Sequence, residues 1–395
     1  MTASLDDYRW LVGDDAAPWL RKVEENLRGT PPTPAYLRQL RLGLGAERTS
    51  LVLEQVELRR KAQEKFGEAP ELFFTRTGLE QATDQLLAAY KAQKFADANS
   101  VIDLCCGIGG DAMALARDHT LSLVDRDEVS LLFASVNVSS VRQFGPPLCF
   151  AESVDAQHVA ECDAWHIDPD RRSSGKRTSR VELGDPGIEV IDRLRAANPH
   201  AAIKLAPAAD VPEPWLEECE REWIETRGEC RQQVVWLGSL AERSGSHVAT
   251  LVDANGEGCS FSGEPEVVIE SSNSVGAFLF DPAPSLVAAR LVGALSEALE
   301  VSGLSLQSLY LTGDLELQHP LLQAFAVEAE MPLDVRKLRS YFQSRNVGRL
   351  EIKKRGIDIT PEALRPQLAL SGDSESTLIL TRVGSKTRAI VGRRL

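Results

Sequence analysis

Hydrophobic positions recur with helical spacing in the first part of the chain. Between residues 46 and 66, leucine and valine lie among charged side chains and no glycine or proline interrupts the run, which predicts a helix. A second helix is expected from about residue 79 to 95. The Gly- and Pro-rich run at 29–34 separates an earlier helix from a later one. The pattern therefore predicts a helical region that extends to about residue 70.

From residue 100 the pattern changes to short β-branched runs separated by longer amphipathic segments. This alternation is typical of strands and helices in a parallel sheet, so we expect a doubly wound α/β fold with one antiparallel strand near the sheet's edge. A turn at 253–256 follows the last run and predicts a closing hairpin. The expected strands are 101–104, 121–124, 148–150, 164–167, 201–205, 234–237 and 247–252.

An acidic, turn-rich stretch around residues 263–276 indicates a domain boundary. We therefore expect three parts along the chain. They are a helical N-terminal region at 1–70, the sheet domain at 71–272 and a C-terminal α+β domain at 273–395.

Charge is distributed unevenly along the chain. The 395 residues carry a formal net charge of −14, from 44 Lys and Arg against 58 Asp and Glu, so a polyanionic partner needs a local basic patch. Residues 331–395 hold 14 Lys and Arg against 6 Asp and Glu, a net +8 that leaves −22 on the rest. A solvated basic face is the simple explanation, but clustering of this size in an acidic protein favours contact with RNA or DNA.

Several classes of protein are disfavoured by the composition. No apolar run approaches the roughly 18–20 residues that span a bilayer, and the acidic N-terminal residues do not resemble a signal peptide, so we expect a cytoplasmic protein without membrane contact. Seven cysteines without a C-x-x-C pair and six scattered histidines argue against disulfides and a metal site. Cys105 and Cys106 are interpreted as small buried residues, and His166 as a core residue.

A glycine turn follows the first expected strand. Gly107 and Gly109 allow the backbone to turn sharply and to approach a ligand closely. Together with Ala112 they also fit the dinucleotide pattern G-x-G-x-x-A, so an enzyme that uses nicotinamide or flavin stays open. Asp103, four residues before Gly107, suits a cationic amino-acid moiety and would repel a pyrophosphate, which favours a positively charged sulfonium cofactor. Asp125 ends the next strand and can accept hydrogen bonds from both hydroxyls of a ribose.

The Asp-x-x-x-Gly-x-Gly segment at 103–109 resembles the first motif of the class I S-adenosylmethionine-dependent methyltransferases. The resemblance implies a seven-stranded Rossmann-like sheet and S-adenosylmethionine as cofactor. It implies contacts of Asp103, Gly107 and Gly109 with the methionine moiety, of Asp125 with the ribose, and of Glu152 with the adenine amino group. Asp127 is interpreted as the N-cap of the following helix.

The segment Asp163-Ala-Trp-His-Ile-Asp168-Pro-Asp-Arg-Arg172 resembles the catalytic Asp-Pro-Pro loop of that family, with Asp170 in place of the second proline. Its Asp-Pro-x-Arg-Arg form is similar to a branch of RNA methyltransferases that carry a C-terminal THUMP-like domain, and that branch is similar to the RNA cap guanine-N2 methyltransferases. Further matching segments extend the resemblance from about residue 70 to the end. It implies catalytic roles for Asp168, Pro169 and Arg171, and tRNA or rRNA as substrate.

The chemistry of such a loop depends on position. Proline fixes φ and lacks an N–H, so carbonyls and the Asp168 carboxylate can point at an acceptor amine. The amine develops positive charge as it attacks the methyl group, and these dipoles stabilise that charge. Trp165 or Phe74 is expected to stack on a flipped base, because the loop lacks the usual aromatic residue.

Basic residues follow the Asp-Pro segment closely, with five of them in residues 171–180. A solvated loop is the simple explanation, but intervening Gly and Ser residues favour a flexible clamp on phosphates. A protein or small-molecule methyltransferase, or a catalytically silent RNA-binding protein, is the alternative. The residues expected to bind the substrate are Arg172, Lys176, Arg177, Lys353, Lys354 and Arg355.

Overall fold

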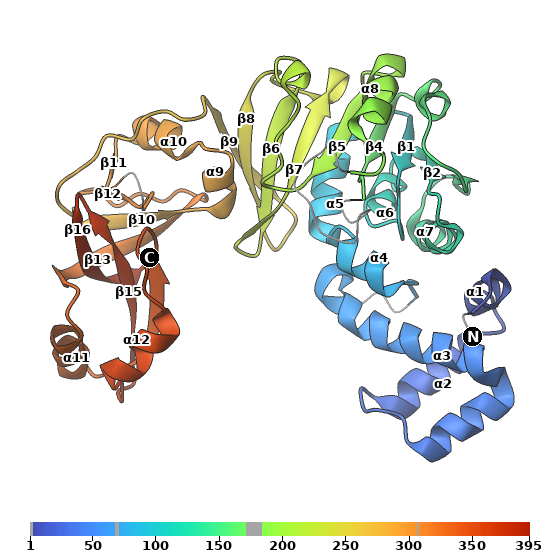
Figure 1. The fold of residues 1–395 in the computed structure, drawn as a ribbon, viewed down its shortest axis with the longest axis horizontal. Coiled ribbons are helices and arrows are strands. Elements are labelled where there is room, and N and C mark those ends of the chain that lie inside the picture. The colour runs from blue at the N-terminus through green and yellow to red at the C-terminus, as the bar shows by residue number, and fades with distance from the viewer. Residues whose placement is uncertain (1–2, 68–70, 171–183, 306–307) are drawn as a thin grey trace. The chain divides into compact units, whose positions relative to one another are not determined.

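The computed structural model describes residues 3–67, 71–170, 184–305 and 308–395 (Figure 1). The chain divides into two compact units, each described here by itself. Unit 1 comprises Met1–Glu220, Gln233–Gly245 and Ala254–Glu257, and unit 2 comprises Arg221–Gln232, Ser246–Asp253 and Gly258–Leu395. The three-part division expected from the sequence stays a prediction.

Unit 1 begins with a helical region, as the hydrophobic pattern predicts. The predicted helix at 46–66 is confirmed as the second part of α3, which has a non-helical glycine at Gly45 (φ 78°). The helices of unit 1 are α1 (Leu5–Leu11), α2 (Ala17–Leu27), α3 (Pro34–Phe66), α4 (Arg76–Gln81), α5 (Gln85–Ala92), α6 (Ala112–Leu115), α7 (Glu128–Val141) and α8 (Ile188–Ala197). Short 3-10 turns are η1 (Gln93–Phe95), η2 (Ala156–Val159), η4 (Glu213–Trp215) and η5 (Gly238–Leu240).

The continuous helix expected at 79–95 is wrong, because α4 ends at Gln81 and α5 begins at Gln85. Asp84 adopts an extended backbone (ψ 144°), and its side chain accepts a hydrogen bond from the Leu86 N–H. Such N-capping satisfies an amide that the first turn of a helix leaves without a partner. A local cap therefore starts a new helix where the hydrophobic period alone suggested continuity.

The strands of the first sheet lie in the order β3-β2-β1-β4-β5-β7-β6-β8-β9. All seven expected strands are present, so the predicted α/β class is confirmed, but the predicted count of seven is wrong because β6 and β9 are added. The predicted hairpin is β8–β9. The strands are β1 (Ser100–Leu104), β2 (Thr120–Val124), β3 (Leu148–Phe150), β4 (Ala164–Ile167), β5 (Ala201–Leu205), β6 (Glu220–Thr226), β7 (Glu229–Leu237), β8 (His247–Val252) and β9 (Gly258–Gly263).

The pairing is mostly parallel, as expected. β1 pairs in parallel with β2 and with β4, and in the second ladder Asp103 lies opposite His166. β3 and β5 extend this parallel arrangement, whereas β5 with β7 and β8 with β9 are antiparallel pairs. The carboxyl ends of β1, β2 and β4 therefore lie at one edge, where open α/β sheets bind ligands.

Helices cover both faces of the parallel strands. Ile102 and Leu104 of β1 belong to a buried cluster with Ile191 and Leu194 of α8. Because side chains alternate along a strand, Asp103 points to the opposite face, where α5 and the loop before α6 lie. This arrangement is the doubly wound fold that the sequence predicts.

Unit 2 contains a seven-stranded sheet in the order β11-β12-β10-β13-β16-β15-β14, in agreement with the expected C-terminal α+β fold. β14 pairs with β15 in parallel, and α11 and α12 pack on them through a cluster that contains Leu338, Phe342, Leu364 and Leu368. The strands are β10 (Phe278–Pro282), β11 (Ser302–Gly303), β12 (Leu311–Gly313), β13 (Leu322–Pro332), β14 (Val347–Lys354), β15 (Ser374–Val383) and β16 (Lys386–Arg394). The helices are α9 (Pro284–Ala288), α10 (Val292–Ala298), α11 (Val335–Ser344) and α12 (Pro361–Leu368). Among the described helices, none is long and apolar enough to cross a membrane.

Candidate functional site

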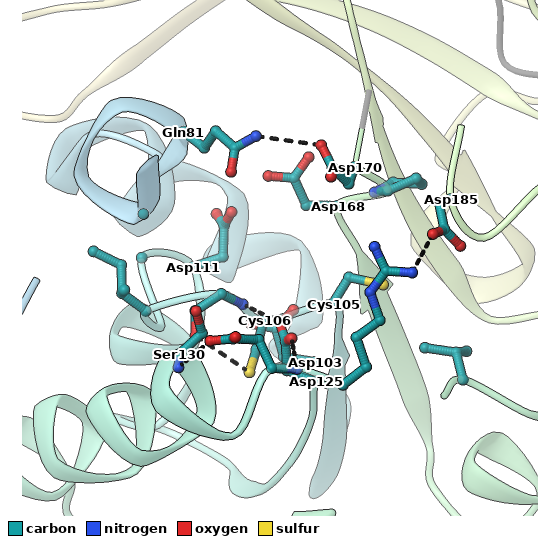
Figure 2. A pocket seen from close by; sticks show the side chains of 18 of the residues that line it. Gln81, Asp103, Cys105, Cys106, Asp111, Asp125, Ser130, Asp168, Asp170 and Asp185 are labelled. Carbon is teal, nitrogen blue, oxygen red and sulfur yellow. Dashed lines mark hydrogen bonds and ion pairs between the residues drawn. The ribbon is translucent and has the colours of Figure 1, made fainter. Parts of the chain in front are cut away.

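A cavity of about 380 Å³ opens at the carboxyl ends of β1, β2 and β4 (Figure 2). Its walls come from α4, from the turn after β1, and from the loops that follow β2 and β4. Carboxylates dominate its lining. The sequence-predicted residues Asp103, Gly107, Asp125, Glu152 and Asp168 all line this cavity. Pro169 lines it as well.

The glycine turn lies between β1 and α6, as predicted. Cys105 (φ 55°), Gly107 (φ 54°) and Gly109 (φ 85°) all have left-handed backbone conformations, which glycine adopts without strain. A Cβ on Gly109 would lie 3.2 Å from the Ala134 Cα atom of α7, whereas a Cβ on Gly107 would meet nothing within 4 Å. Gly109 therefore permits close packing of α7, and Gly107 leaves free space at the cavity.

Asp125 is held by two backbone amides. Its Oδ2 atom accepts a hydrogen bond from the Gly107 N–H at 2.8 Å, and its Oδ1 atom accepts one from the Asp127 N–H at 2.9 Å. Burial raises the pKa of Asp125, although both backbone hydrogen bonds oppose that shift. Asp127 caps α7 by accepting the Ser130 N–H, which confirms its predicted role. The turn after β1 and the loop after β2 are thus locked together around a carboxylate.

Asp103 lies in the floor of the cavity and is buried. Its Oδ1 atom is 2.6 Å from the His166 Nδ1 atom, and both side chains are 2% exposed. Burial raises the pKa of Asp103, and the neighbouring His166 opposes this effect. His166 is a core residue, as expected, but it is a polar one that joins β1 to β4 through the Asp103 carboxylate.

Two buried lysines also lie beside this floor, and the sequence reasoning missed both. Lys91 of α5 is 2.7 Å from Asp111, and Lys204 of β5 is 2.5 Å from Asp168. Thr83 donates a hydrogen bond to Asp111 at 2.6 Å. Burial alone would raise the pKa of Asp111, but the Lys91 ammonium holds it well below its ordinary value. The sequence feature that could have identified Lys204 was a lysine inside the otherwise apolar strand Ala-Ala-Ile-Lys-Leu.

The Asp-Pro segment leaves the carboxyl end of β4 at the cavity. Asp170 accepts a hydrogen bond from the Gln81 side chain of α4 at 3.3 Å, and it forms an isolated β-bridge with Asp185. Asp185 in turn forms an ion pair with Arg126, so the segment is tied to the loop after β2. Of the remaining predicted residues of this loop, Arg171, Arg172, Lys176 and Arg177 lie outside the described residues.

Glu152 lies at the rim of the cavity, with its side chain half exposed. Its Oε1 atom is 2.9 Å from the His158 Nε2 atom, and the His158 ring packs edge-on against Phe150. The rim position is compatible with the adenine contact that the family resemblance implies. The role of Glu152 stays a prediction.

The two aromatic residues expected to stack on a base lie in the protein interior and not at the cavity. Trp165 and Phe74 are 0% and 1% exposed, and neither lines the cavity. The Trp165 indole N–H donates a hydrogen bond to the Asn198 carbonyl, and the ring belongs to the core beneath α8. That expectation is wrong, because alternation along β4 turns Trp165 into the apolar core and away from the face that carries His166.

The thiols of the glycine turn are not poised for chemistry. Burial raises the pKa of Cys105 and of Cys106 well above the ordinary value, and nearby carboxylates add to the effect. A protonated thiol is a poor nucleophile. Both residues therefore fit their interpretation as small structural side chains. Within the described residues no group of three or more His, Cys, Asp or Glu side chains could hold a metal ion.

The predicted basic residues of the C-terminal region lie at the end of β14 in unit 2. Lys353 and Arg355 each lie 2.9 Å from a carboxylate oxygen of the buried Asp281. Arg355 also lies over the Tyr310 ring. Lys354 points away from this pair and is exposed. Two of the three cations thus share one carboxylate within the domain.

Comparison with known proteins relates the chain to a domain family, to a curated relative and to a solved structure. The family described as THUMP domain-like matches residues 322–394. An uncharacterized S-adenosylmethionine-dependent methyltransferase of Mycobacterium tuberculosis strain H37Rv is 31% identical over 351 residues, which cover 86% of this chain and 94% of the relative. A solved structure of a proposed methyltransferase from Porphyromonas gingivalis W83 covers 100% of both chains at 18% identity with a TM-score of 0.81, so the fold is shared.

Proposed function

The chain belongs to the S-adenosylmethionine-dependent methyltransferases, and from this premise we propose that it methylates an exocyclic amine of a nucleobase in RNA, either tRNA or rRNA. The chain is an enzyme that uses S-adenosylmethionine. This membership removes the nicotinamide or flavin alternative and that of a catalytically silent protein. We place the enzyme in the cytoplasm, where its cysteines stay reduced.

The cavity suits the cofactor. Asp125 presents a partly buried carboxylate that can accept hydrogen bonds from two ribose hydroxyls, and Gly107 leaves room where a side chain would intrude. We assign Asp103 and the glycine turn to the methionine moiety and Glu152 to the adenine. When bound, the cofactor supplies a methyl group: the acceptor nitrogen takes the methyl carbon, sulfur keeps the electron pair of the broken bond, and the surplus proton of the nitrogen leaves to water.

The observation that carries the nucleobase assignment is the Asp168–Pro169 segment, which leaves β4 at the same cavity as the glycine turn. One carboxylate oxygen of Asp168 accepts a hydrogen bond from Lys204, so the other oxygen can accept one from the N–H of the substrate amine. Pro169 has no N–H and leaves its carbonyl as a further acceptor. Charge that develops on the attacking amine is stabilised by such dipoles. We assign a supporting role to Arg171.

Three features support RNA as the substrate. The THUMP domain-like match covers residues 322–394, and the sequence resembles RNA methyltransferases with a domain of that kind. Residues 331–395, nearly all of them within that match, carry a net +8, and a polyanion needs such a local basic region in an acidic protein. We assign phosphate contacts to Arg172, Lys176 and Arg177, and to the segment Lys353–Arg355, of which Lys354 is exposed.

The test is methyl transfer from labelled S-adenosylmethionine to total RNA of a strain that lacks the protein. Nucleoside mass spectrometry then identifies the product. We expect labelled RNA with the parent and loss of at least 100-fold in rate with Asp168→Ala, about 2.7 kcal/mol of lost transition-state stabilisation. S-adenosylhomocysteine should still bind the variant. Label in protein but not in RNA would contradict the assignment of the substrate.

A further inference from the structure

Lys204 is a buried cation whose position the packing of the sheet does not require. It is the only charged residue of β5, all five residues of that strand are buried, and the Lys204 side chain is 8% exposed. Burying an ammonium group is costly, and replacing a buried ion pair with apolar residues is often neutral or stabilising. Stability alone does not account for the lysine. Its role therefore depends on the carboxylate with which it forms an ion pair.

That partner is Asp168, the carboxylate of the proposed acceptor site. The Lys204 Nζ atom lies 2.5 Å from the Asp168 Oδ2 atom, and the Asp168 side chain is 27% exposed against 8% for Lys204. One oxygen therefore faces a buried ammonium while the more exposed carboxyl group lines the cavity. The geometry fixes both the orientation of the carboxylate and its local charge.

A second buried ion pair lies close to this one. Lys91 and Asp111 form a second buried pair at 2.7 Å, and Lys204 interacts electrostatically with both of them. Burial lowers the pKa of Lys91, and the nearby Lys204 ammonium contributes to that effect. Asp111 and Asp168 both line the cavity (Figure 2). The Asp168 and Asp111 carboxylates are therefore each paired with a buried ammonium group.

A carboxylate in this state selects the kind of nitrogen that it contacts. An unpaired carboxylate strongly attracts a protonated alkylamine, because opposite charges a few ångströms apart interact strongly where water is scarce. A carboxylate already neutralised by an ammonium loses that attraction but keeps its lone pairs. It still accepts a hydrogen bond from an uncharged N–H.

We propose that Lys204 is a positioning residue that neutralises Asp168 and turns one of its oxygens toward the acceptor, so that the site selects an uncharged amine or amide nitrogen over a protonated alkylamine. Exocyclic amines of nucleobases are uncharged and therefore fit such a site. The inference rests on the proposed function and restricts its substrates to uncharged nitrogen groups. Lysine side chains and aliphatic polyamines are disfavoured as substrates.

The first experiment measures kcat and KM between pH 6 and 9 with labelled S-adenosylmethionine and RNA from the deletion strain. Lys204→Met should lower kcat at least tenfold with little change in the KM for RNA, and Lys204→Arg should restore most of it. Asp168→Asn should also be slow, because Lys204 attracts the amide oxygen and turns the NH₂ group toward the acceptor. In Asp168→Asn/Lys204→Met the amide oxygen is free to turn, so this double variant should be at least fivefold faster than Asp168→Asn.

The second experiment does not depend on RNA. Butylammonium chloride is titrated into the complex with S-adenosylhomocysteine and followed by NMR. Lys204→Met should bind it at least fivefold more tightly than the parent, because Asp168 is then an unpaired carboxylate. Equal binding by the two proteins would overturn the inference. If this shift is seen while no RNA is labelled, the proposed substrate fails and the role of Lys204 stands.

Lys94→Met is the matched control. Lys94 also forms partly buried ion pairs, with Glu220 and Glu242, but it does not line the cavity. The Lys94→Met substitution should lower the free energy of unfolding and leave methyl transfer and butylammonium binding within twofold of the parent. A Lys204→Met enzyme as fast as the parent, or a double variant no faster than Asp168→Asn at any pH, would contradict the positioning role.

Discussion

Single carboxylates determine what the cavity can bind, and Asp125 is the simplest to test. Asp125→Ala removes two backbone contacts and the proposed ribose contacts, so we expect the affinity for S-adenosylhomocysteine to fall by about 1–3 kcal/mol. Isothermal calorimetry measures this directly. Asp118→Ala, at an exposed residue that does not line the cavity, should bind like the parent. Unchanged binding by Asp125→Ala would remove the residue from the cofactor site.

Asp111 makes stability depend on pH. Because Lys91 holds its pKa below the ordinary value of 3.8, the unfolded chain binds more protons than the folded chain as the pH falls through that value. Its contribution is therefore present above the ordinary pKa and is lost as the pH falls below it. We expect the free energy of unfolding to fall between about pH 5 and pH 3, and Asp111→Asn to reduce that slope.

Urea unfolding at several pH values measures this slope. Lys91→Met/Asp111→Asn removes both charges and serves as a second variant if the single substitution does not fold. If the free energy of unfolding falls as steeply with decreasing pH in both variants as in the parent, other carboxylates are responsible for the pH dependence.

At the scale of elements, the N-terminal helices support a wall of the cavity. The Lys65 Nζ atom of α3 donates hydrogen bonds to the carbonyls of Leu79, Glu80 and Ala82 at 2.8–2.9 Å, at the end of α4. Gln55 of the same helix bonds both the N–H and the carbonyl of Phe74, just before α4 begins. Because α4 lines the cavity, helices that carry no family motif still determine its geometry.

Lys65→Met should therefore loosen α4. We expect a loss of about 1.5–3 kcal/mol in the free energy of unfolding, because several charged hydrogen bonds disappear. Hydrogen exchange of the amides in 76–83 should become faster. Lys61→Met is the matched control on the same helix, since Lys61 forms an exposed pair with Glu57 whose loss costs less than about 1 kcal/mol. Equal effects of the two substitutions would show that α4 does not depend on Lys65.

At the scale of the whole molecule, charge is segregated along the chain, and the basic residues at the end of β14 differ in their exposure. Lys354 is exposed, whereas Lys353 is paired with Asp281. If RNA binds this region, Lys354→Gln should reduce the log–log salt slope of its affinity by about 0.7, the value for one phosphate of a single strand. Fluorescence anisotropy with a labelled RNA at several salt concentrations measures it.

Lys353→Gln is the contrasting variant. Because Lys353 is paired with Asp281, this substitution should change the salt slope less than Lys354→Gln does. The thermal stability of the protein should fall, because Asp281 loses a partner. If both substitutions leave the slope unchanged, RNA is not held at the end of β14.

Local pattern was sufficient for much of this protein. The seven strands, the glycine turn and the cap at Asp127 follow from alternation, from backbone freedom at glycine and from short-range hydrogen bonding, all of which act within a few residues. The family motif adds the location of Asp168. These features can be predicted from the sequence because interactions between neighbouring residues are sufficient to produce them.

Only the tertiary structure decided which polar side chains meet in the interior. β6 was missed because Glu220, Glu222 and Glu225 look like exposed positions, yet all three are buried. Lys204 meets Asp168 from 36 residues away, and His166 meets Asp103 from 63 residues away. Sequence periodicity reports whether a residue is polar, but its partner is set by the order in which the strands are placed in the sheet, and that order arises from long-range packing.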